Sequence, residues 1–197
     1  MNESVILASA SPRRRELLKL IVPTFETAVS DAEEQVQAPK DLPLEQLPEF
    51  FARVKAEDIA ARYPNQLVIG SDTGVLAPGA DGQLQLLGKP VDEADARRML
   101  RLLSGQKHWV STGCCLCYQG RSRSFSEIAE VEFYPLTDAD IDAYIATKEP
   151  MDKAGSYGIQ GYGALLVKGI RGDFYTIMGL PVARLNREIQ SWMKEIM

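Results

Sequence analysis

The chain has 197 residues, 45% of them hydrophobic and 25% charged, a composition typical of a soluble globular protein. Its formal net charge of -5 argues against a nucleic-acid-binding surface, which would show as a basic excess or stripe. No apolar run approaches the ~20 residues of a membrane span, and the N-terminus lacks a signal-peptide pattern. We therefore expect a cytoplasmic protein without a membrane partner, with one domain over residues 1–197.

The N-terminal segment predicts a strand followed by a helix. Residues 5–8 are all apolar, as in a buried strand. Ser11 and Pro12 suit the N-cap and the first position of a helix. The predicted helix has an apolar stripe formed by Leu17, Leu18 and Ile21.

Three consecutive arginines occupy the first turn of this helix. The positive end of the helix dipole and the unpaired backbone N–H groups favour an anion there and disfavour cations. We expect Arg13 and Arg14 to bind a polyphosphate or another polyanion. Arg15 should face solvent, because successive helical residues are roughly 100° apart. Alternatively, all three are solvated helix formers.

The rest of the chain predicts an α/β fold with a mixed sheet. Expected strands cover residues 24–29, 67–70, 84–87, 108–118, 122–134, 164–170 and 174–178. Expected helices cover 49–62, with Phe51, Val54 and Ile59 in the core, and segments beginning at Asp92, Thr137 and Pro181. The helix from Asp92 has one apolar face, formed by Ala96, Met99, Leu100 and Leu103. The helix from Thr137 begins with a capping-box pattern completed by Asp140 and continues through Ile141, Tyr144 and Ile145. The consecutive strands late in the chain can pair antiparallel, which makes the sheet mixed.

The three cysteines invite a metal or redox interpretation, because Cys114 and Cys117 have C-x-x-C spacing. Residues three apart in a strand face opposite sides, and there is no second pair. The single histidine, His108, lacks a ligand partner at helical spacing. We therefore expect buried, reduced thiols.

An aspartate follows the apolar run at 67–70. A carboxylate at the carboxyl end of a strand lies where open α/β sheets usually bind ligands, so Asp72 could activate water or hold a divalent metal. Alternatively, it caps a loop. Asp-Thr-Gly at 72–74 also matches a short signature of aspartic proteases, but a second triplet is absent and the helical patterns do not suit an all-β protease.

Other candidate groups would suit a nucleotide. Lys89, in a turn after a strand, could contact phosphate, and Lys55 and the acidic pair Glu33 and Glu34 could also take part, although each could be ordinary surface. The segment 152–163 has four glycines together with Lys153 and Gln160, so its backbone can approach a ligand and an amide can read a base edge. A plain connecting loop is the alternative. Together these parts suit phosphoryl transfer to water.

Several motifs resemble those of the Maf family of nucleoside triphosphate pyrophosphatases. They are Leu-Ala-Ser-x-Ser-Pro-Arg-Arg-x-Glu-Leu-Leu at 7–18, Gly-x-Asp-Thr at 70–73, Leu-Gly-Lys-Pro at 87–90, Leu-Ser-Gly at 103–105, Glu-Pro-x-Asp-Lys-Ala-Gly-x-Tyr-Gly-Ile-Gln-Gly at 149–161, Gly-Asp-x-Tyr at 172–175 and Gly-Leu-Pro at 179–181. The resemblance covers nearly the whole chain in order.

The resemblance implies an enzyme that hydrolyses a nucleoside triphosphate to the monophosphate and pyrophosphate with a divalent cation, Mg²⁺ or Mn²⁺. It also implies an elongated mixed sheet flanked by helices, with two lobes around a cleft, similar to inosine triphosphate pyrophosphatases. Family members are commonly homodimers.

The resemblance also implies roles for single residues. Asp72 matches the catalytic proton acceptor. Arg13, Thr73 and Gln160 match positions linked to substrate choice and resemble the branch that acts on dTTP and UTP. A branch that prefers methylated GTP tends to carry glutamate in place of Gln160.

The chain departs from the family pattern at two places. Gly74 replaces an apolar residue, and the segment 41–51 is divergent and interrupted by prolines. Neither departure removes a proposed catalytic group.

We therefore expect Asp72 to activate water against the α-phosphorus while a metal, held by Glu33 and Asp72, bridges triphosphate oxygens. Arg13, Arg14 and Lys89 would stabilise the leaving pyrophosphate. Polar contacts are expected from Ser9, Lys55 and Lys153. The competing hypothesis is a regulator of cell division that binds nucleotides without turnover.

Overall fold

The computed structural model describes residues 4–79 and 81–196. They form two compact units, of which the first comprises residues 4–72, 112–127 and 179–196 and the second comprises 73–79, 81–111 and 128–178. The expectation of one family domain over residues 1–197 stays a prediction. Because the unit boundaries fall inside three long strands, each unit draws on segments that are far apart in the sequence.

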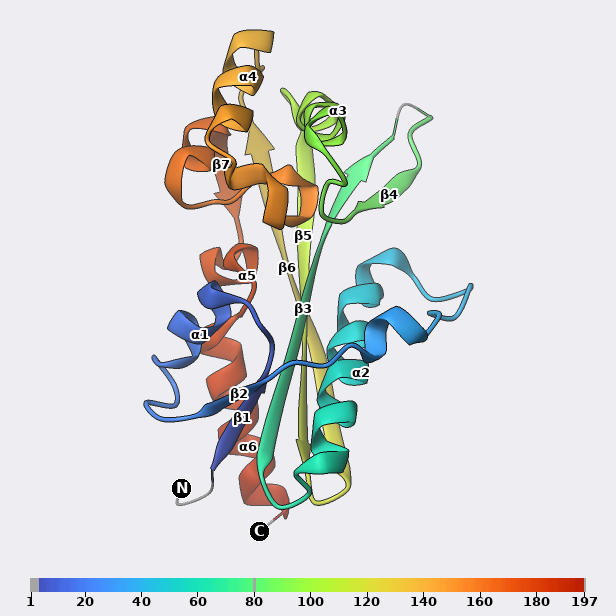
Figure 1. Ribbon diagram of the computed structural model, residues 1–197, viewed down its shortest axis with the longest axis vertical. Helices are drawn as coiled ribbons and strands as arrows, with labels where there is room; N and C mark the ends of the chain where they lie inside the picture. Colours follow the sequence, from blue (N-terminus) through green and yellow to red (C-terminus); the bar gives the residue numbers. More distant parts are fainter. Residues whose placement is uncertain (1–3, 80, 197) are drawn as a thin grey trace. The chain divides into compact units, whose positions relative to one another are not determined.

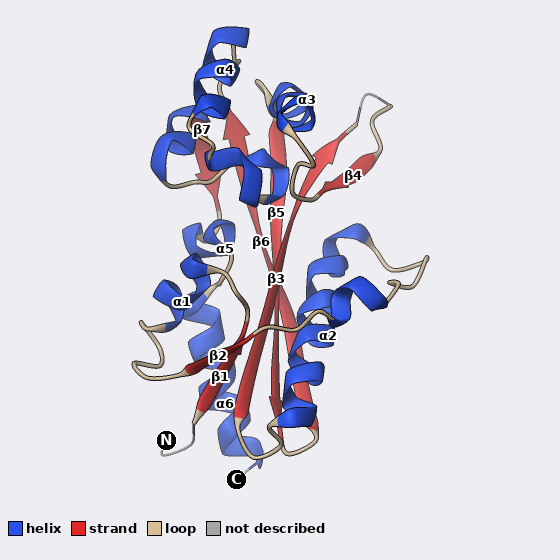
Figure 2. Cartoon of the chain, in the orientation of Figure 1, coloured by secondary structure: helices blue, strands red, loops and turns tan. Residues whose placement is uncertain are grey.

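The strands of the described residues belong to a mixed sheet with helices beside it, which confirms the predicted fold class (Figure 2). The strands are β1 (Val5–Ala8), β2 (Glu26–Ala28), β3 (Leu67–Pro78), β4 (Leu84–Leu87), β5 (Lys107–Tyr118), β6 (Arg121–Phe133) and β7 (Val167–Arg171). Their order is β2-β1-β3-β5-β6-β7, and β4 pairs with β3. β1 runs parallel to β2 and β3, whereas β4 and β7 pair antiparallel with β3 and β6.

The α-helices are α1 (Pro12–Leu18), α2 (Leu47–Arg62), α3 (Glu93–Leu103), α4 (Asp138–Ala146), α5 (Phe174–Met178) and α6 (Val182–Ile196). None of the described helices has the length and apolar character that a membrane span requires.

In the first unit, α2 and α6 lie on opposite sides of the strands (Figure 1). Small residues of α2, Ala52 and Ala56, pack with Ile59 against Ile6, Ala8 and Val68. The predicted core positions Phe51 and Val54 were wrong, because both side chains are only half-buried. Alanines instead let α2 approach the sheet closely.

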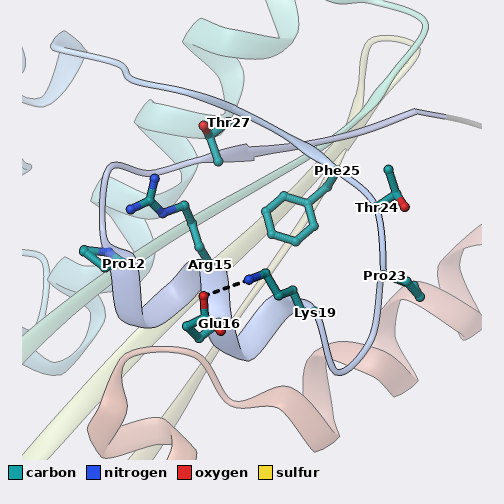
Figure 3. Close-up of a pocket in the computed structure, with 8 residues that line it drawn as sticks. All are labelled: Pro12, Arg15, Glu16, Lys19, Pro23, Thr24, Phe25 and Thr27. Carbon is teal, nitrogen blue, oxygen red and sulfur yellow. Dashed lines mark hydrogen bonds and ion pairs between the residues drawn. The ribbon is translucent and has the colours of Figure 1, made fainter.

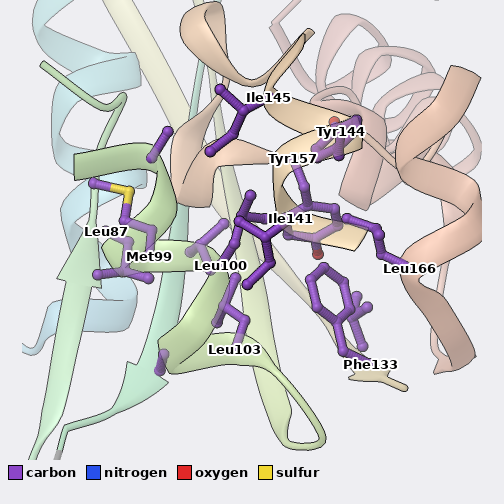
Figure 4. Packing of buried hydrophobic residues seen from close by; sticks show 14 of the residues in the cluster. Leu87, Met99, Leu100, Leu103, Phe133, Ile141, Tyr144, Ile145, Tyr157 and Leu166 are labelled. Atoms are coloured by element: carbon purple, nitrogen blue, oxygen red, sulfur yellow. The ribbon is translucent and has the colours of Figure 1, made fainter. Parts of the chain in front are cut away.

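In the second unit, α3 and α4 bury their apolar faces in one cluster (Figure 4). The predicted face of α3 is confirmed, since Ala96, Met99, Leu100 and Leu103 are all buried. Ile141, Tyr144 and Ile145 of α4 join this cluster, together with Phe133 and Tyr157. The period of 3.6 residues therefore identified both buried faces correctly.

Side-chain caps explain where several helices begin. Ser11 caps α1 by accepting a hydrogen bond from the Arg14 backbone N–H, and Thr137 forms the predicted capping box with Asp140. Residues 174–178 form α5 instead of the expected strand, because the Asp173 carboxylate accepts hydrogen bonds from the backbone N–H and the hydroxyl of Thr176. Ile21 lies beyond the end of α1, which is shorter than expected.

All three cysteines are free and buried, as expected. Cys114 lies 3.9 Å from the Ser71 hydroxyl oxygen, and burial raises the pKa of its thiol to about 12. The sulfurs of Cys115 and Cys117 lie 3.8 Å apart in the core beneath α2. The burial of all three side chains indicates that they serve packing.

His108 is fully buried in the second unit. Its Nε2 lies 2.8 Å from the Tyr157 hydroxyl oxygen, and its ring packs edge-on against Phe133 and Tyr157. Burial lowers the pKa of His108 to about 4. The imidazole is therefore neutral in the folded protein at neutral pH.

This burial makes the stability of the fold depend on pH. Between pH 6.5, the ordinary pKa of histidine, and about pH 4, the unfolded chain binds a proton at His108 that the folded chain does not bind, so stability falls as the pH falls through this range. Relative to a His108→Phe variant, the wild type should lose about 1.4 kcal/mol of unfolding free energy between about pH 7.5 and about pH 5.5. Urea unfolding of both proteins at the two pH values measures this difference. Equal losses in the two proteins would contradict the burial of a neutral imidazole.

Candidate active site of the first unit

The candidate site lies where β1 ends beside β3, which is longer. Ala8 at the end of β1 pairs with Gly70 of β3, and the chain then leaves the sheet toward α1. The strand predicted at 67–70 continues to Pro78, so Asp72 lies inside β3 and the expectation that it follows the end of its own strand was wrong. Asp72 instead lies two residues beyond the end of β1. Asp72 thus still lies at the carboxyl end of a parallel strand, where α/β sheets usually bind ligands, but that strand is β1 and not β3.

Lys55 joins two carboxylates in this region. Its ammonium Nζ lies 2.6 Å from Asp72 Oδ1 and 2.8 Å from Glu33 Oε2. Lys55 is only 8% exposed, and such a buried charge needs paired opposite charges. Glu33 comes from the short 3-10 helix η1 (Ala32–Gln35), so three distant segments supply the triad.

The close contact of α2 with β3 places Lys55 within reach of Asp72. A Cβ atom added to Gly70 would lie 2.3 Å from the carbonyl oxygen of Ala52 and 2.8 Å from the Cβ of Ala56. Lys55 stands between these two alanines in α2, on the same buried side. Because Gly70 of the Gly-x-Asp-Thr motif has no side chain, α2 can pack close enough to β3 for Lys55 to reach Asp72.

Arg14 is held by two oxygen atoms of the same unit. Its Nε donates to the carbonyl oxygen of Gly179 at 2.9 Å, and its Nη1 donates to the hydroxyl oxygen of Ser9 at 3.3 Å. Burial lowers the pKa of the Arg14 guanidinium, while the negative charge of Asp72 opposes this change. An arginine side chain is not deprotonated in proteins, so Arg14 places a fixed positive charge near Asp72.

The three arginines of α1 differ as expected in exposure. Arg13 and Arg14 are half-buried and Arg15 is exposed. Arg15 lines a surface hollow of about 390 Å³, together with residues of α1 and of the segment leading into β2 (Figure 3). The hollow contains an ion pair between Lys19 and Glu16 and none of the predicted substrate-binding residues, so we assign it no part in the site.

Four predicted site residues belong to the second unit. Thr73 is half-buried, whereas Lys89 and Gln160 are exposed. The ammonium of Lys153 lies 2.6 Å from both the Glu149 carbonyl oxygen and Asp152 Oδ1. Its contacts with these oxygens hold the glycine-rich segment, and a role in binding substrate stays a prediction.

The sequence reasoning missed two residues that shape this glycine-rich segment. The Glu149 carboxylate accepts hydrogen bonds from the backbone N–H groups of Tyr162 and Gly163. The Tyr144 hydroxyl oxygen accepts one from the backbone N–H of Gly158. Gly163 leaves no room for a side chain, since an added Cβ would lie 2.1 Å from the Gly158 carbonyl oxygen. The motif at 149–161 includes Glu149 but gives it no role, and the density of glycines indicates close backbone approach without naming a partner.

The triad of Glu33, Lys55 and Asp72, with Arg14 nearby, offers carboxylates for proton transfer and fixed cations for an anionic ligand. Over the described ranges 4–79 and 81–196, no group of three or more His, Cys, Asp or Glu side chains is arranged to hold a metal ion. Two carboxylates do converge on one point, however, and Mg²⁺ is commonly bound by one or two carboxylates together with substrate phosphates. The Lys55 ammonium occupies the point that these two carboxylates share, so a divalent cation held by Glu33 and Asp72 stays a prediction.

The sequence matches the family model of Maf-like proteins over residues 4–192. The chain therefore belongs to the Maf family, as the motifs predicted.

Individual relatives agree with this assignment. The chain is 45% identical to a dTTP/UTP pyrophosphatase of Bacillus mycoides over 195 residues, which cover 98% of this chain and 97% of the relative. It is 47% identical to a dTTP/UTP pyrophosphatase of Bacillus cytotoxicus over 190 residues, covering 95% and 94%. The structure of a HAM1 protein from Coxiella burnetii superimposes with a TM-score of 0.50 at 14% identity, covering 96% of this chain and 99% of that one. This last likeness concerns the fold alone.

The packing at Gly70 predicts a large cost for one added methyl group. Gly70→Ala should lower the unfolding free energy by about 2–3 kcal/mol, because the Cβ would press against the backbone of α2. Gly169→Ala is the matched control, since that glycine also lies in a strand and an added Cβ meets nothing within 4 Å. Urea unfolding of the two variants and the wild type measures both changes. If Gly70→Ala were no more destabilising than Gly169→Ala, the proposed close contact would be refuted.

Proposed function

We propose that this protein hydrolyses dTTP and UTP to the nucleoside monophosphate and pyrophosphate. The contact of Lys55 with Asp72 and Glu33, near the guanidinium of Arg14, carries the proposal. It combines a base for water with fixed positive charge for a triphosphate. Membership of the Maf family, and the two Bacillus relatives named dTTP/UTP pyrophosphatase, support the same reaction.

Asp72 acts as the proton acceptor in this proposal. A water molecule attacks the α-phosphorus and gives its proton to the Asp72 carboxylate as the new oxygen–phosphorus bond forms. The bond from the α-phosphorus to the bridging oxygen breaks, and pyrophosphate leaves with the electron pair. Lys55 keeps the Asp72 carboxylate oriented, because its ammonium contacts one of the two oxygens at 2.6 Å.

Cations stabilise the charge that develops on the leaving pyrophosphate. Arg14 is held in position by the Gly179 carbonyl oxygen and the Ser9 hydroxyl, and Arg13 comes from the same turn of α1. Lys89 and Lys153 are further contacts proposed from the family motifs. Fixed cations of this kind act mainly in the transition state, where the negative charge on the leaving group grows.

A divalent cation, Mg²⁺ or Mn²⁺, is part of the proposal. Glu33 and Asp72 would hold it with the triphosphate, and it would supply Lewis-acid stabilisation of phosphate charge. Lys55 contacts both carboxylates, so it keeps the oxygens of Glu33 and Asp72 near one another.

The choice of pyrimidine rests on Arg13, Thr73 and Gln160. A glutamine amide offers one donor and one acceptor, which match the imide edge shared by thymine and uracil. The exposed Gln160 follows a segment whose shape is set by Glu149 and Tyr144. A cytoplasmic location and assembly as a homodimer complete the proposal and rest on the resemblance to the family.

The direct test incubates the purified protein with dTTP, UTP, CTP, GTP or ATP and Mg²⁺, and measures monophosphate and pyrophosphate. We expect turnover of dTTP and UTP above the others. Asp72→Asn should reduce kcat by about 10²-fold or more, because the amide cannot accept the proton of water.

Arg15→Ala serves as the control for this variant. It changes an exposed side chain of α1 that the proposal leaves outside the site, so it should retain wild-type kcat. Failure to release pyrophosphate from any nucleotide, with retained binding of dTTP, would replace the proposal by a nucleotide-binding regulator. Full activity of Asp72→Asn would reject Asp72 as the base.

A further inference from the structure

One backbone carbonyl of the first unit accepts two side-chain hydrogen bonds. The carbonyl oxygen of Gly179 accepts from Arg14 Nε at 2.9 Å and from the Ser71 hydroxyl at 3.0 Å. A carbonyl oxygen has two lone pairs, so both bonds can form together. Gly179 thereby links Arg14 of α1 to the strand that carries Asp72.

The backbone of Gly179 is suited only to glycine. Its φ is 108°, a conformation that side-chain-bearing residues rarely adopt. Gly179 directly precedes Leu180 and Pro181, which lead into α6, and both of these residues are buried. The buried residues Leu180 and Pro181 therefore fix the position of the Gly179 carbonyl group. The positive φ of Gly179 sets the direction of its C=O bond, and an alanine would disturb this backbone conformation.

Ser71 is the second part of this arrangement. It is fully buried and stands next to Asp72 in β3, so its hydroxyl fixes that part of the strand to the Gly179 carbonyl. Arg14 is bound at Nε by Gly179 and at Nη1 by Ser9, and two contacts to a planar guanidinium fix its plane as well as its position.

We infer that Gly179 and Ser71 are positioning residues that set the guanidinium plane of Arg14 relative to Asp72. They act through Arg14 and contact no substrate. The effect on turnover rests on the proposed hydrolysis, in which Arg14 stabilises the leaving pyrophosphate.

The test uses Gly179→Ala and the control Gly120→Ala. Gly120 also has a positive φ, of 74°, and lies in the turn between β5 and β6, where an added Cβ meets nothing within 4 Å. With dTTP, kcat of Gly179→Ala should fall roughly tenfold with KM changed by less than about threefold, because a misplaced cation loses most in the transition state. Gly120→Ala should keep kcat within about twofold of the wild type. Equal kcat losses in the two variants would mean that any glycine with a positive φ has this effect, and they would overturn the inference.

A double-mutant cycle with Arg14→Ala decides whether Gly179 acts through the guanidinium. Once Arg14 is absent, adding Gly179→Ala should change kcat by less than about twofold, because no guanidinium remains to be positioned. Losses that multiply in the double variant would overturn the inference. If Gly179→Ala does not fold, Ser71→Ala takes its place in the same cycle, with a smaller expected loss of about threefold.

The same cycle with a binding readout separates this inference from the proposed function. If the wild type turned over no nucleotide, the proposed function would fail, and calorimetric Kd values for inorganic tripolyphosphate would replace kcat. Weakened binding in Gly179→Ala that disappears in the Arg14→Ala background would uphold the positioning role. Additive changes, or no binding by the wild type, would refute it.

Discussion

The buried ammonium of Lys55 sets the main constraint on the first unit. A charge withdrawn from water is costly unless opposite charges and hydrogen bonds surround it, and Lys55 is 8% exposed between Glu33 and Asp72. Meeting this requirement ties together three parts of the chain: η1, α2 and β3. This arrangement also requires close packing of α2 against Gly70, because a larger residue at position 70 would move Lys55 away from Asp72.

The second constraint is the unequal length of two neighbouring strands. β1 stops at Ala8 while β3 continues past Gly70, so the segment that follows β1 turns away beside Ser71 and Asp72. This step brings the start of α1 to the part of β3 that carries Asp72. It also explains why Arg14 can be fixed by Ser9 from its own segment and by Gly179 from the start of α6.

Local patterns in the sequence were sufficient for much of the fold, and they named Glu33, Lys55 and Asp72 as candidates, but they did not predict the contacts among these residues. The stripe of α3 and the caps at Ser11 and Thr137 depend on residues close in sequence, so spacing predicted them. The full length of β3 was missed because small polar residues after Gly70 look like a strand end, although neighbouring strands hold them in the sheet. The bond from Lys55 to Asp72 crosses 17 positions, and it arises from helix–sheet packing that no local pattern encodes.

The most direct measurement is the unfolding free energy of Lys55→Met, alone and combined with Asp72→Asn, by urea denaturation at neutral pH. The single variant removes the cation shared by two partly exposed carboxylates and should lose about 2 kcal/mol, below the cost of breaking a fully buried pair. Adding Asp72→Asn should recover part of this loss, because it removes one of the two negative charges that Lys55 had joined. A Lys55→Met variant as stable as the wild type would contradict the central role given to this ammonium group.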